Sequence, residues 1–212
     1  MTPTVGVLAL QGAFRAHADI LRELEIDVVE VRTHEQLASV DALVMPGGES
    51  TTMSMLLERN AMLEPLRSRI HDEQLPVLGT CAGMILLSDE ILDGRADQHC
   101  LKAVPISTRR NGYGRQIASF EADLHIDGIE GSFHGVFIRA PIVERIDPEV
   151  EVLAEVDGDP VLCRHRAVTV AAFHPELAGD VRLHRRWLED AGLVAADAPT
   201  RRRQGRKGRS SS

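Results

Sequence analysis

Residues 77–87 read VLGTCAGMILL and carry the strongest structural signal in the chain. The apolar pair Val77–Leu78 predicts a short buried strand, and Ala82–Leu87 predicts the start of a helix. The sequence GTCAG between them has the G-x-C-x-G pattern of a nucleophile elbow, a tight strand-to-helix turn that presents the side chain of Cys81. Its glycines relieve crowding, and the helix N-terminus favours the reactive thiolate. The flanking pattern favours this interpretation over a buried structural cysteine.

Strands and helices alternate on the N-terminal side of this elbow. Three apolar runs predict buried parallel strands: Val5–Leu10, Val28–Val31 and Ala42–Met45. Apolar residues at helical spacing predict a helix over Ala13–Leu24 and another through Leu57, with Ser50 or Thr51 as its N-cap. This alternation predicts an α/β fold with an open, mostly parallel sheet that is flanked by helices.

The second half of the chain has a different pattern. Five strand-like segments are separated by Gly, Pro and Asp turns: Gln116–Ile126, Phe133–Ile138, Glu151–Val156, Pro160–Cys163 and Ala167–Phe173. They predict an antiparallel or mixed extension of the sheet, and Val181–Leu188 predicts a closing helix. We expect one domain over residues 1–193 and a disordered basic tail over residues 194–212.

Charge and composition exclude several classes of function. The net charge is −8, and subtracting the six basic residues of 201–212 leaves −14 on residues 1–200. An acidic body with 3% aromatic residues disfavours binding to nucleic acid or to an anionic membrane. The basic tail is either a solvated charge run or an attachment to an acidic patch on a partner.

The cysteines and the N-terminus bear on the compartment. Cys81, Cys100 and Cys163 form neither a disulfide framework nor a zinc-ligand pattern, so no metal is predicted. The N-terminus lacks a signal-peptide pattern, and no run of about 18 apolar residues predicts a membrane span. We expect a cytoplasmic protein.

A second chemical signal is His174-Pro175-Glu176, which directly follows an apolar run. In an extended segment His174 and Glu176 point to the same side, and Pro175 stiffens the step between them. Such a pair would place a base near the thiol of Cys81 and a carboxylate behind the base. A surface loop would explain these residues equally well if they stood alone.

The third signal is the loop Pro46-Gly47-Gly48-Glu49-Ser50 after the third strand. Its glycines allow close approach of a ligand and offer backbone N–H groups. We expect Gly47, Gly48 and Ala82 to supply donors for an oxyanion. The loop can also simply join a strand to a capped helix. A phosphate-binding P-loop is disfavoured because no Gly-Lys-Ser/Thr follows.

In this order, the loop, the elbow and the His-Pro-Glu motif resemble class I, triad-type glutamine amidotransferases. More narrowly, the chain resembles the family of glutaminase subunits of pyridoxal 5′-phosphate synthases over about residues 4–192. This narrower resemblance depends on six strings: VGVLALQGAFRAH (5–17), PGGESTTM (46–53), GTCAGMILL (79–87), RNGYGRQIASFEADL (110–124), FIRAP (137–141) and FHPEL (173–177). Family members more often have Phe at Tyr113 and Ser at Ala172.

The resemblance implies that Cys81 is the nucleophile of a triad with His174 and Glu176. It also implies contacts with L-glutamine, and the matching residues are Gly48, Glu49, Ser50, Arg110, Ile138 and Arg139. The implied reaction hydrolyses glutamine to glutamate and ammonia without a cofactor. The ammonia would pass to a separate synthase subunit, in a hetero-oligomer that makes pyridoxal 5′-phosphate and raises the glutaminase activity.

Two other interpretations stay open. The first is a glutaminase for another pathway, such as histidine biosynthesis. The second is a binding module that keeps the fold but no longer catalyses a reaction. The strings RNGYGRQ and LQGA disfavour the first, and the intact motif residues disfavour the second. The charges suit free glutamine, since an arginine can clamp its α-carboxylate and an acidic side chain its α-ammonium. Either arginine could instead form a structural salt bridge.

Overall fold

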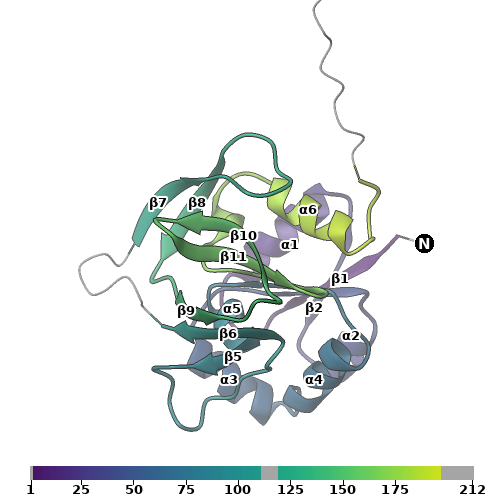
Figure 1. Cartoon of the computed structure of the whole chain (residues 1–212). Coiled ribbons are helices and arrows are strands. Elements are labelled where there is room, and N and C mark those ends of the chain that lie inside the picture. Colours follow the sequence, from purple (N-terminus) through teal and green to yellow (C-terminus); the bar gives the residue numbers. More distant parts are fainter. Residues whose placement is uncertain (1, 111–118, 197–212) are drawn as a thin grey trace, which may run out of the picture.

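The computed structural model describes residues 2–110 and 119–196, and its centre is a seven-stranded sheet in the order β10-β11-β12-β4-β3-β1-β2 (Figure 1). Its strands are β1 (Thr4–Leu8), β2 (Asp27–Val31), β3 (Ala42–Met45), β4 (Val77–Thr80), β10 (Glu151–Val156), β11 (Asp159–His165) and β12 (Val168–Ala171). The five strands from β12 to β2 are parallel, whereas β11 pairs antiparallel with both β10 and β12. The predicted mostly parallel sheet with an antiparallel extension is confirmed.

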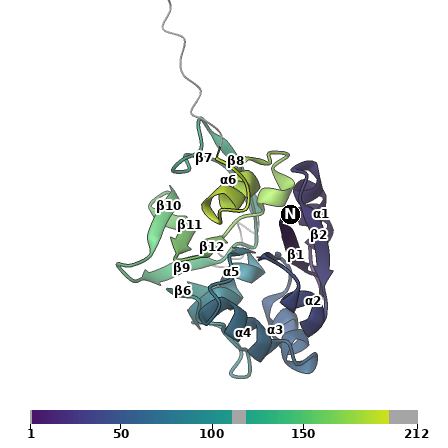
Figure 2. The same cartoon turned by 90° about the vertical axis from the view of Figure 1, so that its right-hand side faces the viewer.

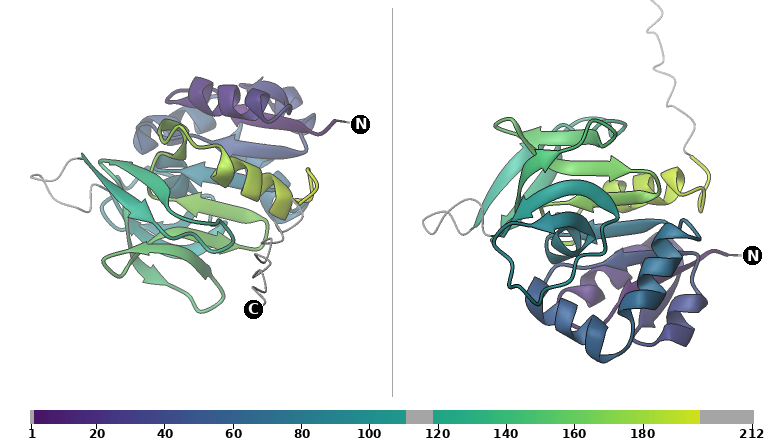
Figure 3. Two further views of the ribbon diagram at one scale, coloured as in Figure 1. Left: turned by 90° about the horizontal axis from the view of Figure 1, so that it is seen from above. Right: turned by 60° about the horizontal axis from the view of Figure 1, so that its bottom comes forward.

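Two smaller sheets lie beside the β10–β11 end of the large sheet (Figure 3). Their strands are β5 (Ser88–Ile91), β6 (Val104–Arg109) and β9 (Ile142–Ile146) in one, and β7 (Ser119–Leu124) and β8 (Phe133–Ile138) in the other. The strand predicted over 116–126 is described from residue 119 and ends at Leu124. Strands β5, β6 and β9 were not predicted, because their polar and apolar residues have no clean alternation.

Helices cover both faces of the large sheet (Figures 1 and 2). They are α1 (Phe14–Glu23), α2 (His34–Ala38), α3 (Ser50–Arg59), α4 (Leu63–His71), α5 (Ala82–Leu87), the 3-10 turn η1 (Pro175–Leu177) and α6 (Arg182–Asp190). On one face α1 and α6 bury Leu21 and Trp187 against Val5. On the other face α2 to α5 form the larger core around residues such as Leu57 and Met84.

The start of α3 differs from the prediction. Its N-cap is Glu49 rather than Ser50 or Thr51, and the Glu49 carboxylate accepts hydrogen bonds from the backbone N–H groups of Thr51 at 3.1 Å and Thr52 at 2.6 Å. The Glu49 carboxylate accepts from the same N–H groups that a Ser or Thr hydroxyl accepts from at an N-cap, and its negative charge complements the helix dipole. The pKa of Glu49 lies below its usual range, since these hydrogen bonds outweigh the opposing effect of burial.

Some predictions concern residues at the edges of the described part. The predicted tail over 194–212 lies outside the described residues from position 197 onward, as does Tyr113 in the RNGYGRQ string. Within residues 2–110 and 119–196, no helix is long and apolar enough to cross a membrane.

Helix α5 lies very close to β3, because position 83 has no side chain. A Cβ on Gly83 would overlap the carbonyl oxygen of Met45, a backbone atom that cannot rotate away. All six residues of α5 are buried, so this contact fixes the helix that follows the elbow.

Gly83→Ala should therefore lower the free energy of unfolding by about 1–3 kcal/mol, since α5 must move away from β3. Urea denaturation would measure the change. Met55→Ala is the control, because Met55 is 52% exposed and its loss should change stability by less than about 0.5 kcal/mol. Equal stability of Gly83→Ala and the wild type would contradict the packing described here.

Candidate active site

Cys81 occupies a strained turn between β4 and α5. Its φ of 49° and ψ of −101° fall in a region that non-glycine residues rarely adopt. Such a conformation costs about 1–3 kcal/mol and persists only where the surroundings impose it. Here the Cys81 N–H donates to the Ala171 carbonyl at 2.8 Å, and the Cys81 carbonyl accepts from Ile85 N–H at 3.2 Å. The structure therefore contains the predicted elbow.

His174 reaches this elbow because β12 runs parallel to β4, with Ala171 paired to Thr80. Both strands end at the same edge of the sheet, so the residues that follow them meet there. The N–H of His174 donates to the Val136 carbonyl of β8 at 2.8 Å, which holds the segment after β12 in place. His174 and Cys81 line one cavity.

The Gly47 loop lies against both residues. A Cβ on Gly47 would stand 2.5 Å from Cε1 of His174 and 3.4 Å from Cβ of Cys81. A side chain at this position would displace the imidazole, so the close contact requires glycine. The loop, the elbow and the His-Pro-Glu motif, which are far apart in sequence, converge at one point.

Glu176 lies behind His174, and its Oε1 is 2.8 Å from Nδ1 of His174. The pairing was predicted, but the backbone geometry that motivated it was wrong. Pro175–Leu177 forms a 3-10 turn, and only His174 retains a non-helical conformation, with φ −106° and ψ 84°. The proline starts the turn, and the turn directs the carboxylate back toward the imidazole.

The charges of this pair reinforce one another. Burial lowers the pKa of His174, but the adjacent Cys81 sulfur and Glu176 carboxylate outweigh burial and raise that pKa to about 10. Burial raises the pKa of Glu176, but the nearby imidazole rings of His17 and His174 outweigh burial and hold that pKa far below its usual range. Near neutral pH the geometry therefore favours a carboxylate next to a protonated imidazole.

The cavity in front of Cys81 has a volume of about 430 Å³. Its lining contains every residue predicted to contact glutamine, together with the two reactive groups and one further residue: Gly48, Glu49, Ser50, Cys81, Ile85, Arg110, Ile138, Arg139 and His174. Ile85 was not predicted, although its position one helical turn after Cys81 places both residues on the same side of α5. Ala82, a predicted oxyanion donor, is the first residue of that helix.

Arg110 is held at the wall of this cavity by polar contacts. Its Nη1 donates to Oγ1 of Thr51 at 2.7 Å, and it lies 3.7 Å from the Glu49 carboxylate. Thr51 Oγ1 donates to Oε1 of Gln98 at 3.1 Å, and Gln98 Nε2 donates to Oγ of Ser50 at 3.1 Å. Sequence patterns did not reveal Gln98, because it belongs to no motif and reaches the loop only through the fold.

Gln11, which lies within the VGVLALQGAFRAH string, holds the glycine loop in place. Its Nε2 donates to the Glu49 carbonyl at 3.2 Å, and its Oε1 accepts from the Glu49 N–H at 3.4 Å. The carbonyl of Gly47 accepts from Ala13 N–H at 3.2 Å. Because the peptide is trans, the N–H of Gly48 points away from Ala13.

Two buried histidines lie behind Glu176. His17 and His184 have no exposed surface, and Nδ1 of His17 is 2.8 Å from Nε2 of His184. Nε2 of His17 is 3.2 Å from Oε2 of Glu176 and 3.2 Å from Oγ1 of Thr80. Sequence analysis missed both histidines, since a single histidine on an apolar helix stripe carries no signal of its partners.

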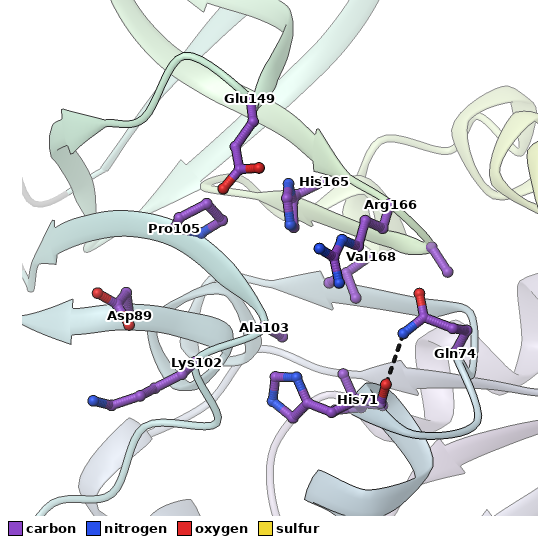
Figure 4. A pocket seen from close by; sticks show the side chains of 12 residues that line it. His71, Gln74, Asp89, Lys102, Ala103, Pro105, Glu149, His165, Arg166 and Val168 are labelled. Atoms are coloured by element: carbon purple, nitrogen blue, oxygen red, sulfur yellow. Dashed lines mark hydrogen bonds between the residues drawn. The ribbon is translucent and has the colours of Figure 1, made fainter.

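A second hollow, of about 240 Å³, lies at the opposite end of the sheet. Val168, the first residue of β12, lines it, together with charged side chains such as Lys102, Glu149 and Arg166 (Figure 4). Cys81 and His174 instead follow the last residues of β4 and β12. The hollow therefore offers charge but neither of the reactive groups, and the cavity at Cys81 is the candidate site.

The part of the chain that the structure describes contains no cluster of three or more His, Cys, Asp or Glu residues arranged to hold a metal ion. Cys81, Cys100 and Cys163 are free thiols. Burial raises the pKa of Cys163 to about 12 and also raises that of Cys100. These two thiols are therefore poor nucleophiles, in contrast to the position of Cys81 beside His174.

A cysteine elbow that faces a histidine–glutamate pair at the carboxyl edge of a parallel sheet defines a hydrolase of the cysteine-nucleophile α/β class. The model of the SNO glutamine amidotransferase family matches residues 7–192. The chain belongs to this family.

Similar proteins agree with this assignment. The chain is 51% identical to a pyridoxal 5′-phosphate synthase subunit PdxT of Mycobacteroides abscessus, over 89% of this chain and 97% of that protein. It is also 51% identical to the protein of the same name from Frankia alni, over 88% of this chain and 94% of the relative. A crystal structure of a glutamine amidotransferase superposes with a TM-score of 0.84 at 48% identity, covering 89% of this chain and 98% of the other.

The buried His184 should make the fold sensitive to acid. Burial lowers the pKa of His184 to about 3, whereas an unfolded histidine titrates near about 6.5. Between these values the unfolded chain binds one more proton, so stability falls as the pH falls, by at most about 1.4 kcal/mol per pH unit. His184→Leu should reduce this slope in urea denaturation between about pH 4 and 6, and an unchanged slope would contradict the burial of a neutral His184.

Proposed function

We propose that this chain is the glutaminase subunit of a pyridoxal 5′-phosphate synthase, in which it releases ammonia from L-glutamine for a separate synthase subunit. The observation that carries the proposal is the cavity in which Cys81 and the His174–Glu176 pair meet all six predicted glutamine-binding residues. Family membership and two relatives named as synthase subunits support it.

The first half of the reaction forms a thioester. With its proton held by His174, the Cys81 sulfur attacks the side-chain amide carbon of glutamine as a thiolate. A carbon–sulfur bond forms while the carbonyl electron pair moves to oxygen. When the tetrahedral adduct collapses, the carbon–nitrogen bond breaks and His174 delivers its proton to the departing nitrogen, which leaves as ammonia.

Backbone N–H groups are suited to hold the oxyanion. Ala82 is the first residue of α5, and its N–H has no partner within the helix. The N–H of Gly48 points away from Ala13, and β4 lies on the opposite side of β3 from β1. An N–H that points away from Ala13, which follows β1, points toward the side of β3 on which β4 and Cys81 lie. The Ala82 N–H and the Gly47–Gly48 peptide are therefore suited to be the donors of the oxyanion hole.

The second half of the reaction is hydrolysis of the thioester. His174 accepts a proton from water as the water oxygen attacks the acyl carbon, and the carbon–sulfur bond then breaks to give glutamate and to restore the Cys81 thiolate beside protonated His174. Glu176 stabilises the imidazolium in both halves and fixes the orientation of the ring through the 2.8 Å contact with Nδ1.

Substrate selection follows from the charges around the cavity. Arg110 and Arg139 offer cationic groups for the α-carboxylate of free glutamine, and Glu49 offers a carboxylate for its α-ammonium. The Glu49 side chain is already ordered, because it caps α3. A site in which opposite charges are fixed in advance favours free glutamine over an amide that lacks either charge.

The released ammonia passes to an acceptor on a separate synthase subunit. A separate synthase chain supplies the sugar-phosphate chemistry, so this chain itself requires no cofactor for hydrolysis. The three free thiols support a reducing, cytoplasmic location.

Glutamate release should require Cys81 and should rise when the synthase subunit is added. The assay measures glutamate from glutamine with and without that subunit, for the wild type and for Cys81→Ala. Loss of all activity above background in Cys81→Ala is expected, because the reaction loses its nucleophile. Activity that needs Cys81 but ignores the synthase would indicate another pathway. No activity in any mixture would indicate a binding module.

Arg110→Gln should raise KM for glutamine about 10- to 100-fold, which corresponds to the loss of about 1.5–3 kcal/mol from a hydrogen bond between charged groups. Steady-state kinetics of the complex would measure it. Arg109→Gln is the matched control, because Arg109 pairs with Glu144 at 2.6 Å on the surface and does not line the cavity. Equal KM values for the two variants would exclude Arg110 as the carboxylate clamp.

A further inference from the structure

Glu176 needs two hydrogen-bond donors, and the proposed mechanism uses only one. Oε1 accepts from Nδ1 of His174 at 2.8 Å. Oε2 is buried and, among the described residues, has no well-aligned hydrogen bond, while Nε2 of His17 lies 3.2 Å away. A buried carboxylate oxygen without a donor is strongly unfavourable, so the ring of His17 is the group that can stabilise it.

The protonation of His17 depends on His184. The 2.8 Å contact joins Nδ1 of His17 to Nε2 of His184, and one of these two nitrogens must carry the proton. If His184 donates, Nδ1 of His17 is the acceptor and the proton of the neutral His17 ring resides on Nε2, facing Glu176. The remaining unpaired atom is then the lone pair on Nδ1 of His184, which is buried without a partner in the described residues.

The reverse order is less favourable on two counts. If His17 donates to His184, a neutral His17 turns a lone pair toward the Glu176 carboxylate, and the two repel. His184 must then carry its proton on Nδ1, which becomes a buried N–H without an acceptor. Orphaned N–H groups are rarer in proteins than unpaired acceptors and cost about 1–3 kcal/mol. A doubly protonated His17 would leave the same orphan on His184.

We propose that His17 is a positioning residue of the glutaminase site, which donates Nε2–H to Oε2 of Glu176 and is held in that tautomer by His184. The chain of donors then runs from Nε2–H of His184 to Nδ1 of His17, and from Nε2–H of His17 to Glu176. Oγ1 of Thr80, at 3.2 Å, shares the proton of His17. Neither histidine lines the substrate cavity, so both act through Glu176.

This arrangement gives the two oxygens of Glu176 separate partners. With Oε2 held by His17, the carboxylate is fixed from behind, and Oε1 stays aimed at His174. Helices α1 and α6, which carry His17 and His184 and cover the face of the sheet opposite to α5, thereby contribute to the orientation of the catalytic base. The inference rests on the proposed function only where it concerns turnover.

The kinetic test compares His17→Leu and His17→Gln in the complete chain, assayed with the synthase subunit. His17→Leu removes the donor and should lower kcat about 10- to 100-fold, as outer partners of metal-bound histidines do, with KM changed less than about threefold. His17→Gln places an amide N–H near the position of Nε2 and should restore kcat to within about fivefold of wild type. Equal kcat values for the two variants, or a wild-type kcat for His17→Leu, would overturn the proposal.

Leu188→Ala is the control for destabilisation alone. Leu188 is fully buried one helical turn after His184 but belongs to the apolar cluster, so its loss weakens the same region without breaking the donor chain. It should keep wild-type kcat at a temperature at which circular dichroism shows every variant folded. A fall in kcat equal to that of His17→Leu would assign the effect to packing and contradict the proposal.

A spectroscopic measurement decides the donor order without turnover. Long-range ¹H–¹⁵N correlation spectra of the full chain with ¹⁵N-labelled histidine distinguish the tautomers, with His17→Gln and His184→Leu used for assignment. Neutral His17 and His184 that both carry the proton on Nε2 are expected. A proton on Nδ1 of His17, alone or together with Nε2, would overturn the proposal. This result stands even if the wild type proves inactive, which would contradict the proposed function instead.

Discussion

The parallel pairing of β4 with β12 is the constraint on which the rest of the site depends. It aligns Thr80 with Ala171, the last residues of the two strands, although 90 positions separate them in the chain. The backbone of Cys81 continues the ladder by donating to Ala171, so the strained turn is fixed by the strand that leads to His174. Nucleophile and base are thus positioned by backbone hydrogen bonds, which leaves their side chains free for chemistry.

Around Cys81 and His174, glycines stand where two backbone segments or a side chain and the backbone pack closely. Polar side chains stand where a buried charged or polar group needs a hydrogen-bond partner. Gly47 and Gly83 let the glycine loop and α5 pack against His174 and β3. Behind the site, the polar atoms of Glu176 and the two buried histidines are almost all paired with one another. Such a network stabilises one geometry strongly when its donors and acceptors match, and it is unfavourable when one is lost.

Much of the fold and of the candidate site was predictable from sequence, for reasons that differ between segments. Short apolar runs bounded by glycine identify the buried parallel strands, since such strands have no polar face. The elbow, the glycine loop and the His-Pro-Glu motif identify chemistry, because few residue types can perform it at that spacing. The N-cap at Glu49 and the 3-10 turn at Pro175–Leu177 were not predictable, because each depends on local geometry that several residue choices allow.

Residue patterns along the chain were enough to predict the class of the sheet, the candidate nucleophile, base and carboxylate, and the family resemblance. The groups that surround these three residues became visible only in the folded molecule. Gln11 and Gln98 order the glycine loop, and His17 and His184 lie behind Glu176, but none of these four belongs to a motif that signals its partner. The physical reason is that such contacts join residues from separate elements, and their distances are set by how helices and strands pack rather than by spacing along the chain.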